Sequence, residues 1–392
     1  MSDQPGFAAR LKAHRFTLLL VVLGLFVVPS SYLAGWMTIE SVNMLGRYLT
    51  FAIVAIGLDL IWGYTGILSL CQALFFSLGG YAMGMYLAHH GGPEGIVDAS
   101  GWKLPACLYV VYPYGIGEAP GDASVPWFWK PFYSLPLTLV LGVLLPGLVA
   151  YLIGYFGFKS KVRGVYFSIL TQAITVAFWL VFCMNNMKLC GTNGLTRFDT
   201  IAGFPLTSDH VKLGLYLITT LMVIASYILC RWLIQSPLGR VLVAVRDDEK
   251  TLRFSGYRPY HYKAFVFTIA GGLAGLAGML YAPQMGIFTP ANMAADKSIL
   301  VVIWVAVGGR GTLSGAVIGA LAVNLFYSML TTRAPELWPF VQGLMFLAVV
   351  LLMPDGIMGL GAQIKSVFVS FKMKWADRSD ALAGVVPGEE QV

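Results

Sequence analysis

Long apolar runs recur along the whole chain, separated by short stretches that carry most of the charged residues. A helix needs about 20 apolar residues to cross a hydrocarbon core of roughly 30 Å, because each residue advances about 1.5 Å. Ten segments fit or approach that length, and they are residues 16–36, 43–62, 65–88, 133–157, 164–184, 212–233, 263–282, 298–308, 313–330 and 337–353. The pattern predicts an all-α integral membrane protein, a polytopic bundle of about ten transmembrane helices within residues 16–355.

The eighth segment, residues 298–308, is too short to cross a bilayer as a plain helix. It runs into Gly308, Gly309, Arg310 and Gly311, which can join it to the ninth segment through irregular backbone. Such backbone is tolerated at membrane depth only where protein or a water-filled cavity covers it. We therefore expect a half-helix or re-entrant segment here.

The distribution of Lys and Arg predicts the orientation. If the N-terminus is cytoplasmic and all ten segments cross, the inner stretches hold 16 Lys and Arg and the outer stretches hold six, as the positive-inside rule requires. Both termini are then cytoplasmic, with tails at 1–15 and 356–392, the second of them partly disordered. The same parity places segment 89–132, rich in Gly, Pro and aromatic residues, outside as a packed cap. Segment 235–262 is placed in the cytoplasm.

Composition excludes several classes of function. Of 392 residues, 57% are hydrophobic and 11% are charged, which leaves too little polar surface for a soluble enzyme. The formal net charge is +7, and the basic residues lie in short stretches between the apolar runs. Membrane topology explains this distribution without binding to nucleic acid. No H-E-x-x-H or G-x-S-x-G motif occurs, and the five His residues show no metal-ligand spacing. Since G-x-x-x-x-G-K-[ST] is also missing, any ATP that drives this protein is bound by another subunit.

The five Cys residues show no C-x-x-C or Cys/His ligand spacing. Three of them lie in or beside apolar runs, where Cys behaves as a small hydrophobic residue. Cys107 and Cys190 both fall outside in the predicted topology, where an oxidising compartment would allow a disulfide. The sequence leaves their pairing open.

Glycine is abundant, with 44 residues, and several lie at close spacing inside the apolar runs. Gly80 with Gly84, and Gly315 with Gly319, form G-x-x-x-G pairs, which let helix backbones approach closely in a membrane. We expect these four residues in helix-packing seams. In a transport bundle such seams also let helices slide or rock.

Polar side chains inside the apolar segments are few, and they are the candidates for a solute path. The two amides in segments rich in Gly and Ser stand out, and with nearby rings and hydroxyls they give the candidate path Gln72, Phe75, Phe167, Thr171 and Gln172. The simpler alternative for each amide is an interhelical hydrogen bond worth roughly 0.6–2 kcal/mol. Asp59 costs more to insert, so we expect it near the cytoplasmic end of its helix, with Arg or backbone partners.

Segment 235–262 has the pattern of a short amphipathic helix between two membrane spans. Pro237 suits a first helical turn, and apolar residues recur after it at near-helical spacing. Asp247 is expected to cap a second helix, and Gly256 to end it. Such a helix either lies on the anionic lipid surface or docks into a groove of a soluble partner. Acids beside arginines favour the protein partner.

Several motifs make the chain similar to a known family. RGVYFSILTQA from residue 163, VRDDEKTLRFSGY from residue 245, VGGRGT from residue 307 and GTNGLT at 191–196 resemble the LivM-type inner-membrane permeases of the branched-chain amino acid and urea ABC importers. The resemblance covers about residues 40–360 and is strongest to the urea permeases. It departs in the third segment: the family usually has Gly, then His or Gln, after Ser-Leu, whereas Cys71 and Gln72 stand here.

The resemblance implies partners and site residues. Such a permease pairs with a second homologous permease, two cytoplasmic ATPase subunits and a periplasmic or extracellular solute-binding protein, and imports a small polar solute across the bacterial inner membrane. It implies no catalytic residue or cofactor here, because ATP is bound by the partners. The region that meets an ATPase would comprise Ser236, Gly239, Arg240, Arg246, Asp247, Asp248, Glu249 and Gly256. The external loop motif would comprise Thr192, Asn193 and Gly194.

Urea agrees with the polar inventory, because it is uncharged and offers four N–H donors around one carbonyl. An amino acid zwitterion would instead need a buried charge or half-helix termini aimed at its carboxylate. Import of branched-chain or other amino acids, or of short amides, is the alternative within the family. A stand-alone channel or secondary transporter is the alternative of a different class, favoured by the Gly-rich broken helices. A membrane enzyme is disfavoured because no catalytic set occurs.

Overall fold

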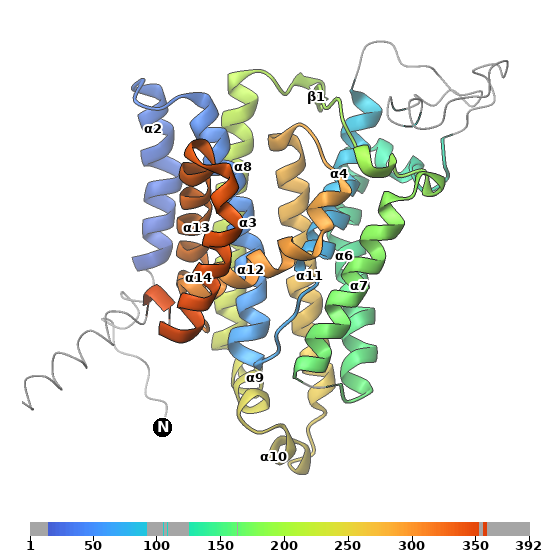
Figure 1. Cartoon of the computed structure of the whole chain (residues 1–392), viewed down its shortest axis with the longest axis vertical. Helices are drawn as coiled ribbons and strands as arrows, with labels where there is room; N and C mark the ends of the chain where they lie inside the picture. The colour runs from blue at the N-terminus through green and yellow to red at the C-terminus, as the bar shows by residue number, and fades with distance from the viewer. Residues whose placement is uncertain are drawn as a thin grey trace, which may run out of the picture.

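The computed structural model describes residues 15–91, 105, 108, 125–162, 164–352 and 356–358. Nearly all of both expected tails, most of the expected external segment 89–132, and Cys107 lie outside the described residues. The described chain is a bundle of helices, and its one sheet has two strands of two residues each (Figure 1). The prediction of an all-α polytopic membrane protein is confirmed.

Most of the described helices follow one another with short connections, whereas residues 184–208 separate α7 from α8. The first runs over Arg15–Leu33 and includes a π-helical turn, η1 (Val22–Val27), before α2 (Val28–Leu33). The later helices are α3 (Ile39–Thr65), α4 (Gln72–His90), α6 (Leu135–Lys159), α7 (Val165–Cys183), α8 (Asp209–Gln235), α9 (Pro237–Asp247), α10 (Glu249–Phe254), α11 (Pro259–Met285), α12 (Ala295–Gly308), α13 (Leu313–Arg333) and α14 (Trp338–Leu352). The 3-10 turns are η3 (Lys130–Tyr133), η4 (Asn185–Met187), η5 (Gly191–Asn193), η6 (Pro290–Met293) and η7 (Pro335–Leu337), and the antiparallel strands are β1 (Thr200–Ile201) and β2 (Phe204–Pro205).

Among the described residues, seven helices are long and apolar enough to cross a membrane: the first helix, α3, α6, α7, α8, α11 and α13. Helices α4, α12 and α14 occupy the other three segments expected to cross, with 19, 14 and 15 residues. Each of the ten expected segments therefore contains a helix, but three of these helices are shorter or more polar than simple spanning helices.

The expected span 65–88 is interrupted near its start. Gly66 adopts φ 74°, a left-handed conformation that glycine tolerates and that ends α3. The following residues are not helical until α4 begins at Gln72. Figure 1 shows this connection running from the lower end of α3 up to α4, alongside the neighbouring helices. The prediction of one continuous helix here is wrong, because apolar composition continues through a stretch whose backbone is not helical.

The short eighth segment is α12, and its 14 residues extend only about 21 Å. The connection 309–312 separates it from α13, with Gly309 at φ 119°. A Cβ on Gly319 would lie 2.1 Å from Trp304 O, and one on Gly315 would lie 2.6 Å from the carbonyl oxygen at the end of α12. The two helices therefore pack backbone to backbone, and the expected half-helix is present.

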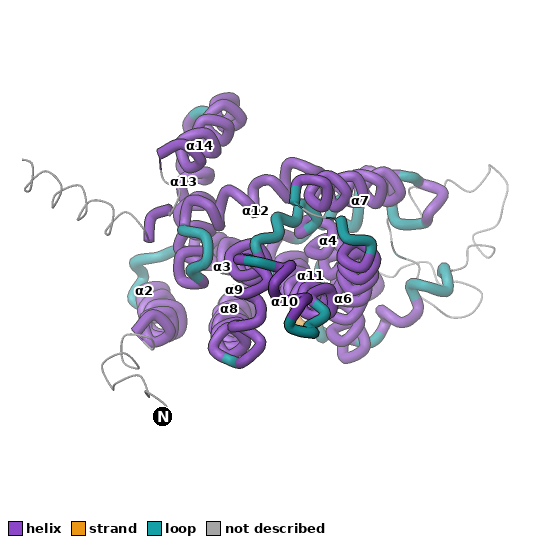
Figure 2. The backbone as a smooth tube through the Cα atoms, turned by 90° about the horizontal axis from the view of Figure 1, so that it is seen from below, coloured by secondary structure: helices purple, strands orange, loops and turns teal. Residues whose placement is uncertain are grey.

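Helix α11 is central, packed against α3, α4 and α6 (Figure 2). Close approach to α4 depends on glycines. A Cβ on Gly278 would lie 1.8 Å from Phe76 O, and one on Gly79 would lie 2.0 Å from Gly275 O. No side chain fits at these crossings, because backbone atoms of the facing helix occupy the space.

The expected helix seam at Gly80 and Gly84 is formed in part, because a Cβ on Gly278 of α11 would lie 2.8 Å from Gly80 N. A Cβ on Gly80 would come within 2.1 Å of the Phe288 ring, and one on Gly84 would lie 2.7 Å from the Leu195 side chain. Both neighbours belong to connections between helices. This G-x-x-x-G pair therefore makes room for loop side chains, while the adjacent Gly79 takes part in the helix crossing.

The two ends of the bundle differ in structure. Helices α9 and α10 project from one end, and β1 and β2 lie at the other (Figure 1). The first helix begins, and α14 ends, in the half of the bundle nearer to α9. The order of crossings agrees with the parity expected from Lys and Arg. The assignment of the α9 end to the cytoplasm stays a prediction.

Candidate coupling surface and solute groove

The coupling hairpin, defined here as residues 237–254, leaves α8 through a tight turn. Ser236 follows the last residue of α8, and its hydroxyl donates to the helix carbonyl three residues earlier at 2.6 Å. Pro237 opens α9, where its missing N–H has no helical partner to lose. Gly239 is buried against α8, and a Cβ there would lie 1.8 Å from Ile234 O. The direction of the hairpin therefore depends on a glycine at 239.

Helix α9 has a buried face and an exposed face. Leu242 and Val245 are buried, whereas Arg240 and Asp247 are exposed. The buried pair anchors the helix on the bundle. The exposed pair leaves a charged surface of both signs at the projecting end of the molecule, and such a surface suits a protein partner.

The cap of α10 is Asp248, not Asp247 as expected from the sequence. Asp248 Oδ1 accepts from the N–H of Lys250 at 2.9 Å and of Thr251 at 3.4 Å, and Oδ2 accepts from the Thr251 hydroxyl at 2.6 Å. These bonds, the Thr251 hydroxyl first, hold the pKa of Asp248 below its usual value. Asp247 instead ends α9. Gly256, at φ 84°, lies just beyond the end of α10.

Glu249 ties α10 to the start of α11. Its Oε2 accepts from Lys263 Nζ at 2.8 Å, and its Oε1 pairs with Arg253. Burial raises the pKa of Glu249, but the two cations outweigh burial and hold this pKa below its usual value. Glu249 therefore makes structural contacts within the chain.

Arg246 turns toward the bundle. Its Nη1 donates to Gly63 O at the end of α3, at 3.1 Å, and its Nε lies 3.1 Å from Asp247 Oδ1. Four of the charged residues expected to meet an ATPase are exposed, namely Arg240, Arg246, Asp247 and Asp248, and Arg246 also connects the hairpin to α3.

A groove of about 920 Å³ lies between α7 and the non-helical segment after α3. Gln172 is its one amide side chain, and Gln172 Oε1 is buried without a hydrogen-bond partner among the described residues. None of the lining side chains is charged. The lining residues are Gly66, Leu68, Leu70, Gly164, Val165, Ser168, Ile169, Gln172, Ala173, Val176, Ala177 and Leu180.

Hydroxyl groups of α7 hold the non-helical segment. Thr171 Oγ1 accepts from the N–H of Leu70 at 3.1 Å, and Thr175 donates to Leu70 O at 3.3 Å. Ser168 donates to Leu68 O at 2.8 Å. Side chains thus satisfy backbone groups that the irregular segment leaves without helical partners. Thr171, expected on the solute path, supports the wall of the groove.

Gln72 is the first residue of α4 and is fully buried. Neither atom of its amide group has a hydrogen-bond partner among the described residues. The next N–H, that of Ala73, donates to Ser298 Oγ of α12 at 3.2 Å. Because Gln72 is not part of the groove lining, the structure does not bring the two candidate amides to one surface.

Phe75 and Phe167 are buried in an aromatic cluster around Phe267. Their ring centroids lie 5.6 and 5.7 Å from that of Phe267, and Phe158 stacks on Phe167 at 4.6 Å. The cluster joins α4, α6, α7 and α11. Among the five candidates for the path, Gln172 is the one that lines the groove.

At the other end, Gly191–Asn193 form η5 and Gly194 makes a tight turn at φ 67°. A Cβ on Gly194 would lie 2.4 Å from Phe288 O. The next residue, Leu195, exchanges two backbone hydrogen bonds with Phe288, at 2.8 and 2.9 Å. The motif therefore fastens one connection to another, while Thr192 and Asn193 are exposed.

Cys190, just before this motif, is disulfide-bonded. Cys71, Cys183 and Cys230 are free. The partner considered for Cys190 from the sequence, Cys107, lies outside the described residues. Within the described part of the chain, no three His, Cys, Asp or Glu side chains lie close enough to hold a metal ion.

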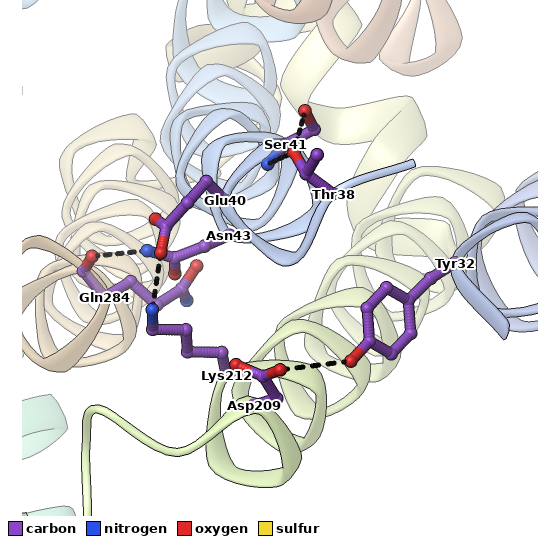
Figure 3. A network of polar contacts seen from close by, with 8 residues as sticks. All are labelled: Tyr32, Thr38, Glu40, Ser41, Asn43, Asp209, Lys212 and Gln284. Carbon is purple, nitrogen blue, oxygen red and sulfur yellow. Dashed lines mark hydrogen bonds and ion pairs between the residues drawn. The ribbon is translucent and has the colours of Figure 1, made fainter. Parts of the chain in front are cut away.

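A polar network at this end ties α3, α8 and α11 together (Figure 3). Lys212 Nζ lies 2.5 Å from Glu40 Oε1, and Asn43 Nδ2 donates to Gln284 O at 3.1 Å. Gln284 Nε2 donates to Thr219 Oγ1 at 2.8 Å. Sequence reasoning missed Gln284 because the expected span stopped at residue 282. A search for amides up to Gly286, which ends α11, would have found it.

Comparison with known proteins bears on this geometry. The family described as "Branched-chain amino acid transport system / permease component" matches residues 41–350. The chain belongs to this permease family. The matched range runs from the start of α3 into α14 and so includes the coupling hairpin, the groove and α12. No solved structure matches the chain.

Individual relatives are permease proteins, not enzymes. The high-affinity branched-chain amino acid transport system permease LivM is 26% identical in Salmonella typhimurium over 308 residues, covering 72% of this chain and 61% of the relative. LivM of Escherichia coli is 26% identical over 331 residues, covering 78% and 66%. The autoinducer 2 import permease LsrC of Salmonella typhi is 29% identical over 224 residues, covering 55% and 62%. The chain thus spans less than two thirds of the length of each of these relatives.

Proposed function

We propose that this chain is one permease subunit of an ABC importer that moves urea or a closely related uncharged amide into the bacterial cell. It works in the inner membrane with a second homologous permease, two cytoplasmic ATPases and an outer solute-binding protein. The chain itself binds no ATP. The observation that carries the proposal is the groove, in which an unpartnered amide lies beside irregular backbone.

The physical argument starts from the backbone of the segment after α3. Irregular backbone at membrane depth is not exposed to lipid, because lipid offers no hydrogen-bond partners. Leu68, Leu70 and Gln172 line an open groove on the side of the bundle. We infer that this side faces the second permease across an aqueous path.

The chemistry of the lining favours an uncharged solute. A zwitterion needs a counter-charge or aligned helix termini, and the lining holds neither Asp, Glu, Lys nor Arg. Gln172 carries the same carbonyl and N–H groups as such a solute, and turning its buried, unpartnered Oε1 toward the groove would let that oxygen accept a hydrogen bond from the solute. Branched-chain amino acids, which the names of the LivM relatives suggest, are the second candidate within the family.

The coupling hairpin supplies the proposed ATPase contact through Arg240 and Asp247. These side chains project from the end that the Lys and Arg count places in the cytoplasm. A salt-sensitive contact of this kind gives register and specificity more than raw affinity.

The test is uptake into proteoliposomes that contain the complete importer and its binding protein. We expect ATP-dependent uptake of labelled urea and none of labelled leucine. Uptake of leucine but not urea would reassign the solute to amino acids. Flux through liposomes that hold this chain alone, without ATPases, would instead establish a channel or secondary transporter.

A further inference from the structure

The last turn of α3 is held by basic side chains from two other elements. The final carbonyls of a helix have no partner within it and carry partial negative charge. Arg246 of α9 donates to Gly63 O at 3.1 Å, and Arg310 of the α12–α13 connection donates to Trp62 O at 3.2 Å. The Arg310 guanidinium also lies 5.0 Å from the centroid of the Trp62 ring. The coupling hairpin and the α12–α13 connection therefore both bind backbone carbonyls at the end of α3.

The last two turns of α3 hold both backbone groups of Gly311. The Gly311 N–H donates to Asp59 Oδ1 at 2.7 Å, and the Tyr64 hydroxyl donates to Gly311 O at 2.9 Å. A Cβ on Gly63 would lie 2.7 Å from Gly311 Cα. The α12–α13 connection thus packs closely on α3 where Gly311 meets Gly63, and the side chains of Asp59 and Tyr64 bind its peptide groups.

Charge acts in both directions here. Asp59 is fully buried and Arg310 is attracted to it, whereas Arg246 and Arg310 repel each other. A carboxylate inside a membrane domain is costly without partners, so Asp59 opposes loss of its hydrogen bond from the Gly311 N–H and of its attraction to Arg310. Displacing α9 therefore pulls on the turn that grips the connection between α12 and α13.

On the basis of the ATPase contact proposed at α9, we propose that the last turn of α3 transmits displacement of the coupling hairpin to the α12–α13 connection. Arg246 and Asp59 are the positioning residues. Helix α12 is the element to be moved, because its short length and the glycines that follow it let it turn without unwinding a long helix.

The experiment uses the complete importer in nanodiscs, with Cys183 replaced by Ser and spin labels attached in pairs. One pair, at Lys250 and Ser160, reports the hairpin against the end of α6. The other, at Ser314 and Ser160, reports the start of α13 against the same reference. Both distances are measured with and without ATP bound to the partner ATPases. In the otherwise unchanged protein we expect both distances to shift.

The variants Asp59→Asn and Arg246→Gln should keep the first shift and lose the second. Tyr64→Phe, which removes one oxygen atom, should reduce the second shift and serves where Asp59→Asn does not assemble. The matched control is Asp209→Asn, the same chemical change at the opposite end, which should leave both shifts intact.

The outcomes separate this inference from the proposed function. If the second shift persists at full size in Asp59→Asn and Arg246→Gln, transmission through α3 is wrong. If ATP does not move the hairpin even in the otherwise unchanged protein, the ATPase contact is elsewhere, and both proposals lose their basis. If ATP shifts only the second distance in the otherwise unchanged protein, the α12–α13 connection is driven by another route. That result also overturns the inference.

Discussion

Lys263 Nζ lies 2.8 Å from Glu249 Oε2, and this ion pair joins the first turn of α11 to the first residue of α10. The side chains are only 11% and 15% exposed, so solvent screens the pair less than an ordinary surface ion pair. The coupling hairpin is thereby fixed to the central helix of the bundle. A proposed partner that pushes on α10 also pushes on α11.

Replacing Glu249 with Gln removes the charge and keeps the shape of the side chain. We expect the hairpin to lose about 1 kcal/mol of local stability, because a charge-assisted hydrogen bond is weakened. Hydrogen exchange of the α10 amides is the measurement, and exchange should become faster. Glu336→Gln is the control at an exposed position, and it should leave α10 unchanged. Equal exchange in both variants would contradict the structural role of Glu249.

The same carboxylate predicts a pH dependence. The folded pKa of Glu249 lies below its ordinary value of 4.5, so its contribution is complete above that value and is lost as pH falls through the folded pKa. Exchange protection of α10, corrected for intrinsic rates, should therefore be constant from about pH 7 to about pH 5 and decline below about 4.5. Glu249→Gln should flatten this part of the profile. A profile that declines equally in the variant would assign the effect to other groups.

The cap at Asp248 gives a second test of the hairpin. Asp248→Ala should cost about 1 kcal/mol, because two backbone N–H groups lose their acceptor. Asp247→Ala should cost far less, since Asp247 is exposed and ends α9 without capping α10. Helix content of the hairpin, measured by exchange at Lys250 and Thr251, distinguishes the two. A larger effect at Asp247 would restore the cap expected from the sequence.

Hydropathy along the sequence predicts where helices lie in this fold, but not where an apolar stretch leaves the helical conformation. Apolar run length predicted the helices of the membrane bundle, and the short run before Gly309 predicted the half-helix α12. The two helices of the coupling hairpin were predicted from amphipathic spacing instead. Hydropathy could not show that the segment from Gly66 to Cys71 is not helical, because its side chains remain mostly apolar. Only the left-handed glycine at 66 carries that information.

Spacing and residue type locate site residues only coarsely for a related reason. Spacing placed Gly80 and Gly84 in a helix seam, but the backbone crossing with α11 lies at Gly79 and Gly80, and Gly84 faces the Leu195 side chain. Residue type selected both Gln72 and Gln172, although their surroundings differ in the packed structure. The one-residue shift of the α10 cap has the same origin, since Asp247 and Asp248 are chemically alike and α9 runs one residue further than expected.

The crossing between α4 and α11 predicts a strong dependence on glycine. Gly278→Ala should destabilise the protein by about 1–3 kcal/mol or more, because the new Cβ would meet Phe76 O at 1.8 Å and backbone must move. Gly214→Ala is the matched control within α8, where nothing lies within 4 Å. That change should be neutral or stabilising by up to about 1 kcal/mol, since Ala favours helix. Thermal unfolding in detergent measures both, and equal midpoints would contradict the crossing.

The two amides Gln172 and Gln284 predict opposite outcomes for one chemical change. Gln172→Leu should leave thermal stability nearly unchanged, because Gln172 Oε1 has no partner among the described residues. The same change should reduce urea uptake about tenfold, since the solute loses one hydrogen bond of about 1.4 kcal/mol. Gln284→Leu should lower stability by about 1 kcal/mol, because Thr219 Oγ1 loses the N–H that it accepts at 2.8 Å, while the Thr219 hydroxyl still donates to Leu215 O. Uptake per folded molecule should then stay near the unmodified level. Normal uptake in Gln172→Leu would show that the groove is a packing surface and that the path runs elsewhere.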